Sequence, residues 1–374
     1  MRKAIIVLVA ITSTFIAFGQ HKLTIRIGSL PSNANTETVF IAGSFNNWNP
    51  HDELCRLKKG DDGTFSISFP NVPEGDYEYK FTKGAWESVE TTSDGKQIAN
   101  RNLKLISDTT LNIDIAGWSE GKTRVIPHSM NDQVQILDSA FNIPQLDRKR
   151  RIWIYLPKNY VTSKARYPVL YMQDGQNLFD DATSFAGEWG VDEALDSAKK
   201  QCIIVGIDNG GTKRMNEYNP YDQEKFGKGE GDLYLQFIVK NLKPYIDKKF
   251  RTKTDAANTI IAGSSMGGLI SMYAVVKYPK IFGKAGVFSP AFWTAPQLKK
   301  DIETMVKPST HKNVRIYFYA GEQEGSQMVE DMLYYFERMR KLAGAKMKVK
   351  INAEGKHNEP TWRHEFPAFY NWII

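Results

Sequence analysis

The chain has 374 residues, of which 41% are hydrophobic, and 49 lysines and arginines against 42 aspartates and glutamates give a formal net charge of +7. Cys55 and Cys202 are too few for a disulfide framework or a cysteine-based zinc site, and we expect no metal and no cofactor. The basic residues are dispersed, and Asp301 and Glu303 interrupt the lysine-rich stretch 299–312, which disfavours a nucleic-acid-binding stripe.

Residues 1–19 have the pattern of a signal peptide. Arg2 and Lys3 precede an apolar run over residues 4–11, and the Ala-Phe-Gly sequence at 17–19 has the small residues of a cleavage site. The apolar run is too short to span a bilayer, and no later segment offers about 20 apolar residues. We therefore expect a periplasmic or secreted protein without a membrane span.

Residues 20–115 show the alternation of short strands. Apolar and polar residues alternate between turn signals in five runs, which are 22–27, 38–42, 64–69, 77–81 and 109–115. This spacing predicts a small β-sandwich. The stretches Gly-Ser-Phe-Asn-Asn-Trp-Asn-Pro at 43–50 and Tyr-Glu-Tyr-Lys-Phe at 77–81 resemble those of starch- and glycogen-binding β-sandwich modules.

That resemblance implies an immunoglobulin-like β-sandwich that binds carbohydrate. Trp48 and Trp86 are the candidate contacts, because the apolar face of a pyranose stacks on a flat ring, and Lys80 and Asn100 are the candidate polar partners. In such modules the first tryptophan is often partly a core residue, and some modules only shape the rim of the enzyme that they precede. Binding to xylan, to an α-glucan or to no sugar stays open.

Residues 116–132 are polar with Gly, Ser and Pro, show neither helical nor strand period, and are interpreted as a linker. The domain from 133 to 374 then begins with two strand-like segments, 133–137 and 149–156, for which we expect antiparallel pairing. Strand and helix patterns alternate afterwards, which predicts a doubly wound α/β sheet. At this length the chain can form two cores.

The run 167–173 predicts a strand that leads into Asp174-Gly175-Gln176. A glycine at 175 would let the backbone approach a substrate, although a plain turn explains Asp-Gly equally well. Further along, the strand-like run 259–262 is followed by Gly-Ser-Ser-Met-Gly at 263–267 and by an apolar helix over 269–276 that ends before Pro279. This is the strand–turn–helix context of a nucleophile elbow, and it makes Ser265 the candidate nucleophile.

Carboxylates and a histidine follow the next two predicted strands. The run 314–320 leads into Glu322 and Glu324, and the run 347–351 leads to His357. Serine needs an imidazole to take its proton, and the imidazole needs a carboxylate to hold its tautomer. We assign His357 as base, with His364 as the fallback. Either glutamate could be the acid on this evidence. The backbone amides of Met266 and Gln176 are the candidate oxyanion donors.

From about residue 133 to the end, the chain resembles an α/β-hydrolase esterase family of the carbohydrate esterase family 1 type, which includes feruloyl and acetyl-xylan esterases, siderophore trilactone esterases and mycolyltransferases. Matching stretches occur in family order: RRIWIYLPKNY, YPVLYMQDGQNLFDD, GEWGVDEAL, IVGIDNGGTKRMNEYNP, FYAGEQEG and GKHNEPTWR. The resemblance implies Ser265, Glu324 and His357 as nucleophile, acid and base. The family acid is often Asp at the third position after the glycine, so Glu324 departs from the pattern and Glu322 stays a rival.

The same resemblance places Trp189, Trp293 and Arg214 near a substrate site, although structural packing would explain the tryptophans at least as well. A sugar-binding module joined to an esterase favours a carbohydrate esterase that removes feruloyl or acetyl groups from plant polysaccharide. The alternatives are an esterase for a non-sugar ester, such as a siderophore lactone, and a non-catalytic sugar-binding protein. Acyl transfer to a sugar hydroxyl is also open to an acyl-enzyme. We expect a polysaccharide or a small ester as the partner.

Overall fold

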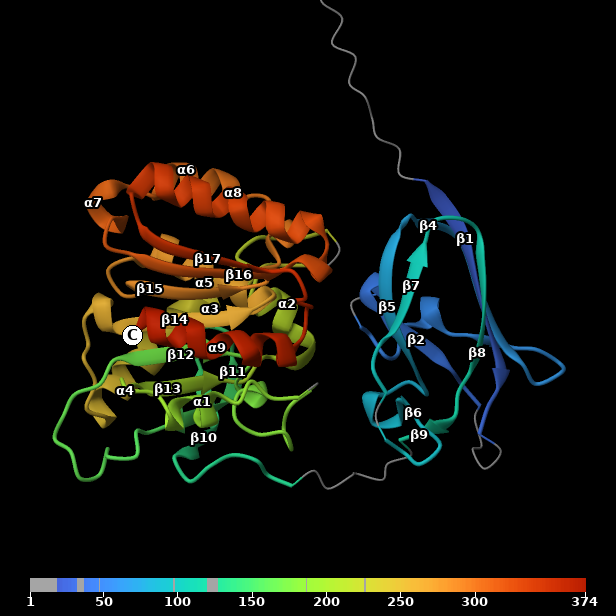
Figure 1. The fold of residues 1–374 in the computed structure, drawn as a ribbon, viewed down its shortest axis with the longest axis horizontal. Helices are drawn as coiled ribbons and strands as arrows, with labels where there is room; N and C mark the ends of the chain where they lie inside the picture. The colour runs from blue at the N-terminus through green and yellow to red at the C-terminus, as the bar shows by residue number, and fades with distance from the viewer. Residues whose placement is uncertain are drawn as a thin grey trace, which may run out of the picture. The chain divides into compact units, whose positions relative to one another are not determined.

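The computed structural model describes residues 19–31, 37–46, 48–96, 98–119, 127–185, 187–224 and 227–374. The expected signal peptide, apart from Gly19, and residues 120–126 of the expected linker lie outside these ranges. The chain divides into an N-terminal unit, residues 1–125, and a C-terminal unit, residues 126–374 (Figure 1). None of the helices in the described ranges is both long and apolar enough to cross a membrane.

Short strands in two main sheets make up the N-terminal unit (Figure 1). One sheet has the order β3-β4-β1-β8, the second has the order β2-β5-β7, and β6 pairs with β9. The strands are β1 (Gln20–Ser29), β2 (Phe40–Gly43), β3 (Lys58–Lys59), β4 (Phe65–Pro73), β5 (Gly75–Thr82), β6 (Glu90–Thr91), β7 (Arg101–Leu105), β8 (Thr109–Asp114) and β9 (Gly117–Trp118).

The two main sheets share one apolar core. Alternate residues of β1, Leu23, Ile25 and Ile27, are buried in the same cluster as Phe81 of β5 and Leu103 of β7. Because side chains alternate between the two faces of a strand, each sheet turns one apolar face toward this core. The five predicted runs overlap strands β1, β2, β4, β5 and β8. The immunoglobulin-like topology stays a prediction.

The expected linker begins too early. Gly117 and Trp118 form β9, which pairs with β6, and Trp118 is buried in the core of the N-terminal unit. At the other end of the expected linker, Met130 packs against a core of the C-terminal unit. Residues 116–132 therefore contain two apolar side chains, Trp118 and Met130, that pack against the cores of the two units. The polar composition of this stretch does not reveal them, because a single buried side chain produces no periodic pattern.

The C-terminal unit is built on an eight-stranded sheet with the order β10-β11-β13-β12-β14-β15-β16-β17 (Figure 1). Strand β11 runs antiparallel to both of its neighbours, as expected for the first pair, and the other pairs are parallel. The strands are β10 (Val134–Ile143), β11 (Arg148–Tyr155), β12 (Val169–Gln173), β13 (Ile203–Ile207), β14 (Thr259–Ser264), β15 (Lys284–Phe288), β16 (Arg315–Gly321) and β17 (Lys346–Asn352).

Helices cover both faces of this sheet. They are α1 (Val191–Asp196), α2 (Arg214–Glu217), α3 (Gly231–Phe237), α4 (Lys243–Lys249), α5 (Met266–Lys277), α6 (Leu298–Met305), α7 (Pro308–His311), α8 (Ser326–Ala343) and α9 (Glu359–Ile373), and a π-helical turn, Ile238–Leu242, joins α3 to α4. The mostly parallel sheet between helical layers agrees with the expected α/β-hydrolase type of fold.

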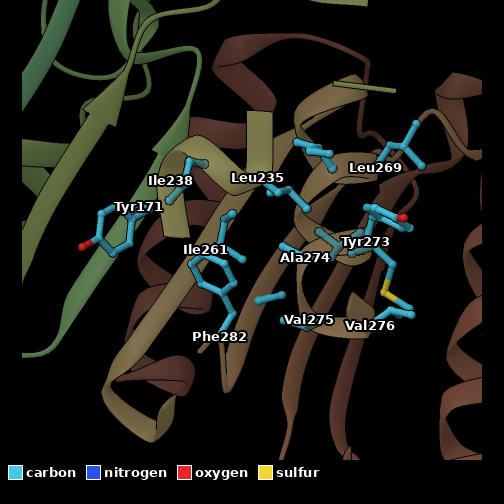
Figure 2. Packing of buried hydrophobic residues seen from close by; sticks show 14 of the residues in the cluster. Tyr171, Leu235, Ile238, Ile261, Leu269, Tyr273, Ala274, Val275, Val276 and Phe282 are labelled. Carbon is cyan, nitrogen blue, oxygen red and sulfur yellow. The ribbon is translucent and has the colours of Figure 1, made fainter. Parts of the chain in front are cut away.

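The alternation of buried residues shows which helices lie on which face. Tyr171 of β12 and Ile261 of β14 belong to the cluster that includes α3 and α5, as Figure 2 shows. Their neighbours Leu170 and Ile260 belong to a second cluster, which includes α1 and α9. Since both faces are apolar, the strands read as continuous hydrophobic runs, and their carboxyl ends are free to carry polar groups.

Candidate active site

Ser265 lies in a sharp turn between β14 and α5. Its backbone has φ 56° and ψ −120°, a conformation that is strained for any residue other than glycine. The turn is held by three hydrogen bonds: Ser265 N donates to Phe288 O at 2.9 Å, and Ser265 O accepts from the Leu269 and Ala291 amides at 3.0 and 3.1 Å. The backbone strain at this serine is therefore fixed by its neighbours.

The flanking glycines make the turn sterically possible. A Cβ at Gly263 would lie 2.8 Å from Gln173 Cγ and 2.9 Å from the carbonyl carbon of Gly267. A Cβ at Gly267 would lie 3.0 Å from Gln173 Cβ. Strand β12 thus packs so closely against the turn that a side chain at Gly263 would displace it. The helix after the turn begins at Met266, three residues earlier than predicted, despite two poor helix formers, Gly267 and Gly268.

Glu324 and His357 are in direct contact. Glu324 follows β16 in the short 3₁₀ turn Glu322–Glu324, and its Oε2 lies 2.6 Å from His357 Nδ1. The Glu324 side chain is 1% exposed and that of His357 is 39% exposed. With Nδ1 donating to the carboxylate, Nε2 of His357 is left as the proton acceptor. The rival acid, Glu322, is exposed.

Two residues that the sequence analysis missed hold the carboxylate in place. Ser289 Oγ donates to Glu324 Oε1 at 2.7 Å, and the Gly321 amide donates to the same oxygen at 2.7 Å. Trp362 Nε1 in turn donates to Ser289 Oγ at 2.9 Å, and the Trp362 ring packs edge-on against His357 with 5.1 Å between centroids. No local spacing signals these contacts, because they join β15, β16 and α9.

Ser265 lies at the same edge of the sheet as this pair. It follows β14, Glu324 follows β16 and His357 follows β17, while Phe288 and Ser289 at the end of β15 contact Ser265 and Glu324 respectively. Among the described residues no hydrogen bond joins Ser265 Oγ to His357. Catalytic hydrogen bonds in structures without substrate are often long and shorten when substrate binds.

The loop after β12 carries one candidate oxyanion donor. Gln176 is the second residue of a 3₁₀ turn, Gly175–Asn177, and Met266 is the first residue of α5, so neither amide has a carbonyl partner within its own helix. A Cβ at Gly175 would lie 2.8 Å from the backbone of β13, at Gly206 C and Ile207 N. Close packing against β13 therefore explains the glycine.

Arg214 contacts this loop as a structural clamp. Its Nε and Nη2 donate to Asp174 Oδ1 and Oδ2 at 2.7 and 2.8 Å, a bidentate ion pair. Asn209 Nδ2 also donates to Asp174 Oδ1, and the Asn209 amide donates to Gln176 Oε1. Arg214 was expected to bind substrate, but its guanidinium is engaged with Asp174, which itself adopts a left-handed φ of 55°. The pair stabilises the loop after β12.

A buried carboxylate lies beneath the same loop. Glu359 Oε1 accepts from Asn177 Nδ2 at 3.3 Å, and burial raises the pKa of Glu359, with the Asp174 carboxylate acting in the same direction. The sequence analysis did not single out this residue, although it lies two positions after His357.

The two predicted tryptophans have different environments. Trp189 is 3% exposed and packs against Phe288 and Trp362, with centroids 5.1 and 5.7 Å away, so it is a core residue and the expectation that it lines the substrate site is wrong. Trp293 is 59% exposed in the 3₁₀ turn Phe292–Thr294, two residues after Ala291, whose amide bonds to Ser265 O. Trp293 is therefore exposed close in sequence to a residue that contacts Ser265, and its role in substrate binding stays a prediction.

In the N-terminal unit, Trp48 and Trp86 come together. Their ring centroids are 6.2 Å apart with an interplanar angle of 39°, and both side chains are half-buried. Lys80 lies on the strand face opposite the core, and burial lowers its pKa. Asn100 directly precedes β7, and its Nδ2 donates to Glu78 Oε2 at 3.1 Å.

The chain is similar in sequence to known proteins. The model of the Esterase family matches residues 143–373, more than half of the chain. The chain is 31% identical over 190 residues to the uncharacterized protein YbbA of Bacillus subtilis, covering 48% of this chain and 70% of that protein. It is 28% identical over 216 residues to an endo-1,4-beta-xylanase/feruloyl esterase of Xylanibacter ruminicola, covering 56% of this chain and 27% of that protein.

Two further proteins are similar to this chain, one in sequence and one in fold. A 95-residue stretch, 25% of this chain and 7% of the other, is 40% identical to an alpha-amylase of Niallia circulans. The crystal structure of the enterobactin esterase FES from Shigella flexneri aligns with a TM-score of 0.55 and 14% identity over 94% of this chain and 92% of that one. At this identity the alignment shows a shared fold alone. The chain spans only a small part of the amylase and of the xylanase/feruloyl esterase.

Proposed function

Because this chain belongs to the Esterase family, we propose that it is a serine esterase that cleaves carboxylic esters through an acyl-enzyme on Ser265. The observation that carries the proposal is the 2.6 Å contact between Glu324 and His357 at the sheet edge where Ser265 adopts its strained turn. A strained, glycine-flanked serine beside an imidazole held by a buried carboxylate is an arrangement suited to nucleophilic catalysis.

Each residue has a defined role in this proposal. His357 Nε2 takes the proton of Ser265 Oγ as the hydroxyl attacks the ester carbonyl, and Glu324 stabilises the imidazolium. The amides of Met266 and Gln176 donate to the tetrahedral oxyanion. The intermediate collapses as His357 returns the proton to the leaving alkoxide, and a water activated by the same imidazole then hydrolyses the acyl-enzyme.

The substrate class that we propose is feruloyl or acetyl esters on plant polysaccharide, met outside the cytoplasm. Three observations support it. A relative is a xylanase/feruloyl esterase, Trp293 is an exposed ring two residues after Ala291, whose amide bonds to Ser265 O, and the Trp48–Trp86 pair is suited to stacking on sugar rings. The leader-like pattern of residues 1–19 supports export.

A second candidate is an esterase for a non-sugar ester such as a siderophore lactone. It is supported by 28% identity over 243 residues, 62% of this chain and 53% of that protein, to an iron(III) enterobactin esterase of Dickeya dadantii. The two candidates share the catalytic residues and differ only in the acyl and alcohol groups that bind, so substrate preference distinguishes them.

The test is a hydrolysis panel of methyl ferulate, acetylated xylan, p-nitrophenyl acetate and a catecholate trilactone. We expect ferulate or acetyl-xylan turnover that Ser265→Ala lowers by at least about 10³-fold in kcat, because the nucleophile is lost. Ser264→Ala, the neighbouring serine in a regular strand conformation, is the matched control and keeps activity. Preferential turnover of the trilactone would favour the second candidate. Inactivity on every ester would contradict both and favour a sugar-binding protein.

A further inference from the structure

Three carboxylates lie together outside the proposed catalytic machinery. Glu188, Asp192 and Glu193, here called the acidic cluster, each offer one oxygen, and these oxygens lie within 4.8 Å of one another. Glu188 precedes the buried Trp189, and the other two residues lie in the first turn of α1. Two oxygens that share one Ca²⁺ at about 2.4 Å are separated by at most about 4.8 Å, so the spacing is compatible with a common ion.

Within the described part of the chain, two buried oxygens of the cluster have no hydrogen-bond partner. Asp192 is fully buried; its Oδ2 accepts from the Asn131 amide at 2.9 Å, but its Oδ1 has no partner. The Glu188 side chain is 1% exposed; its Oε1 contacts Arg363 Nη1 at 3.4 Å, but its Oε2 has no partner. A buried carboxylate oxygen without a partner is costly, because it has lost its water and gained nothing in return, and a bound cation would supply the missing interaction.

The charge of the cluster is also unbalanced. Arg363 is its one basic neighbour among the described ion pairs, and its contacts with Glu188 and Glu193, 3.4 and 3.6 Å, are longer than a charge-assisted hydrogen bond of about 2.8 Å. Three carboxylates and one guanidinium leave a formal charge of −2.

We propose that the acidic cluster binds a divalent cation of the calcium class as a structural ion. The donors are all oxygens, which suits a hard cation, and the half-exposed Glu193 gives the ion a path from solvent. The ion neutralises the charge of −2 and fills the coordination that Glu188 Oε2 and Asp192 Oδ1 lack. It takes no part in the ester-cleaving chemistry.

Aromatic packing connects this site to the proposed base. Trp189, adjacent to Glu188, packs on Trp362, which contacts His357 and donates to Ser289. Arg363 follows Trp362 in α9 and contacts the acidic cluster. The ion would therefore stabilise the first half of α9 and the packed rings of Trp189 and Trp362, the second of which contacts His357.

The test uses Tb³⁺ as a luminescent calcium substitute in the full chain. Excitation of tryptophan should sensitise Tb³⁺ emission through the adjacent Trp189, and added Ca²⁺ should displace it. In parallel, millimolar CaCl₂ should raise Tm by a few degrees, as expected for a ligand that binds only the folded state. Mg²⁺ should act more weakly, because it demands shorter bonds of about 2.1 Å and loses its water reluctantly.

Two cluster variants and one control decide the outcome. Asp192→Asn should lose the emission and the Ca²⁺-dependent rise in Tm, and Glu193→Gln, at a half-exposed position that should not disturb folding, should weaken both several-fold. Glu330→Gln, an exposed acid on α8, should leave both unchanged. The proposal is overturned if Ca²⁺ does not move Tm of the wild type, which would mean that a proton or Arg363 alone satisfies the cluster. It is equally overturned if Glu193→Gln binds Tb³⁺ as tightly as the wild type does, which would mean that the ion binds elsewhere.

Discussion

At the scale of single residues, the surroundings of Glu324 restrict its position closely. Its two oxygens receive three donors, from Ser289, Gly321 and His357, while its side chain is almost fully buried. A carboxylate with this many donors is held in one orientation, which lets it accept the Nδ1 proton of the imidazole and leaves Nε2 free to accept another. Glu322, two residues earlier, is exposed.

This contrast predicts unequal effects for two chemically identical substitutions. Glu324→Gln should lower kcat by about 10³–10⁴-fold, because the amide cannot stabilise the imidazolium and favours the wrong tautomer. Glu322→Gln should leave kcat near the wild-type value. Steady-state kinetics on the best substrate of the panel measures both, and equal losses in the two variants would refute the assignment of the acid.

Ser265, Glu324 and His357 could be proposed as site residues from the sequence, because each follows a strand with a clear apolar pattern. It left Glu322 and Glu324 open on residue reasoning, and only three-dimensional contact separates them. Ser289 and Trp362 could not be found, since their contacts join elements 73 residues apart. Trp189 was misplaced because an aromatic residue near a loop has the same local pattern whether it faces solvent or core.

At the scale of elements, the turn between β14 and α5 depends on close packing against β12. Every residue of β14 is buried, and nearly all of α5 is buried too, so the turn cannot move outward to accommodate a larger residue. The predicted helix begins three residues too late because Gly267 and Gly268 suggest a loop, whereas burial against the sheet overrides their low helix propensity.

Gly263→Ala should therefore destabilise the C-terminal unit by about 1–3 kcal/mol, since the new methyl would overlap Gln173 and the Gly267 backbone. Gly75→Ala is the control, because its Cβ would lie 3.8 Å from the nearest atoms, those of the Tyr77 ring. Thermal unfolding followed by near-ultraviolet circular dichroism measures the change. Unchanged stability in Gly263→Ala would show that β12 relaxes around the turn.

At the scale of the whole molecule, the chain consists of two units with separate cores. The C-terminal unit contains a buried lysine at the start of strand β15. Lys284 of β15 is 9% exposed, and burial, followed by the nearby Arg315 and Lys200, lowers its pKa from the usual 10.5 to about 8. Between these two values the unfolded chain binds a proton that the folded chain does not. The folded state thus bears the full cost of Lys284 below pH 8 and loses that cost as the pH rises toward 10.5.

Lys284→Met should accordingly stabilise the protein at pH 7, on the order of 2–3 kcal/mol. The difference in unfolding free energy between variant and wild type should shrink as the pH rises from 8 to 10.5. Urea unfolding at a series of pH values measures this difference directly and cancels the titration of other groups. A difference that is constant with pH would contradict the assigned pKa.

The division into two units was largely legible from the sequence, because period-2 alternation dominates the first third and alternating strands and helices dominate the rest. The boundary between the two units could not be predicted as well, since the start of the expected linker is attached to the first core through one side chain, that of Trp118. The substrate could not be predicted from the sequence either, because Ser265 and Trp293 lie in turns and loops of the C-terminal unit, whose paths leave no periodic pattern.

The nucleophilic role of Ser265 is tested most directly by intact-mass spectrometry after treatment with a fluorophosphonate. We expect one phosphonyl adduct per chain, mapped by peptide sequencing to Ser265, absent from Ser265→Ala and formed more slowly in Glu324→Gln. An unmodified wild-type protein, or an adduct on another residue, would contradict this role.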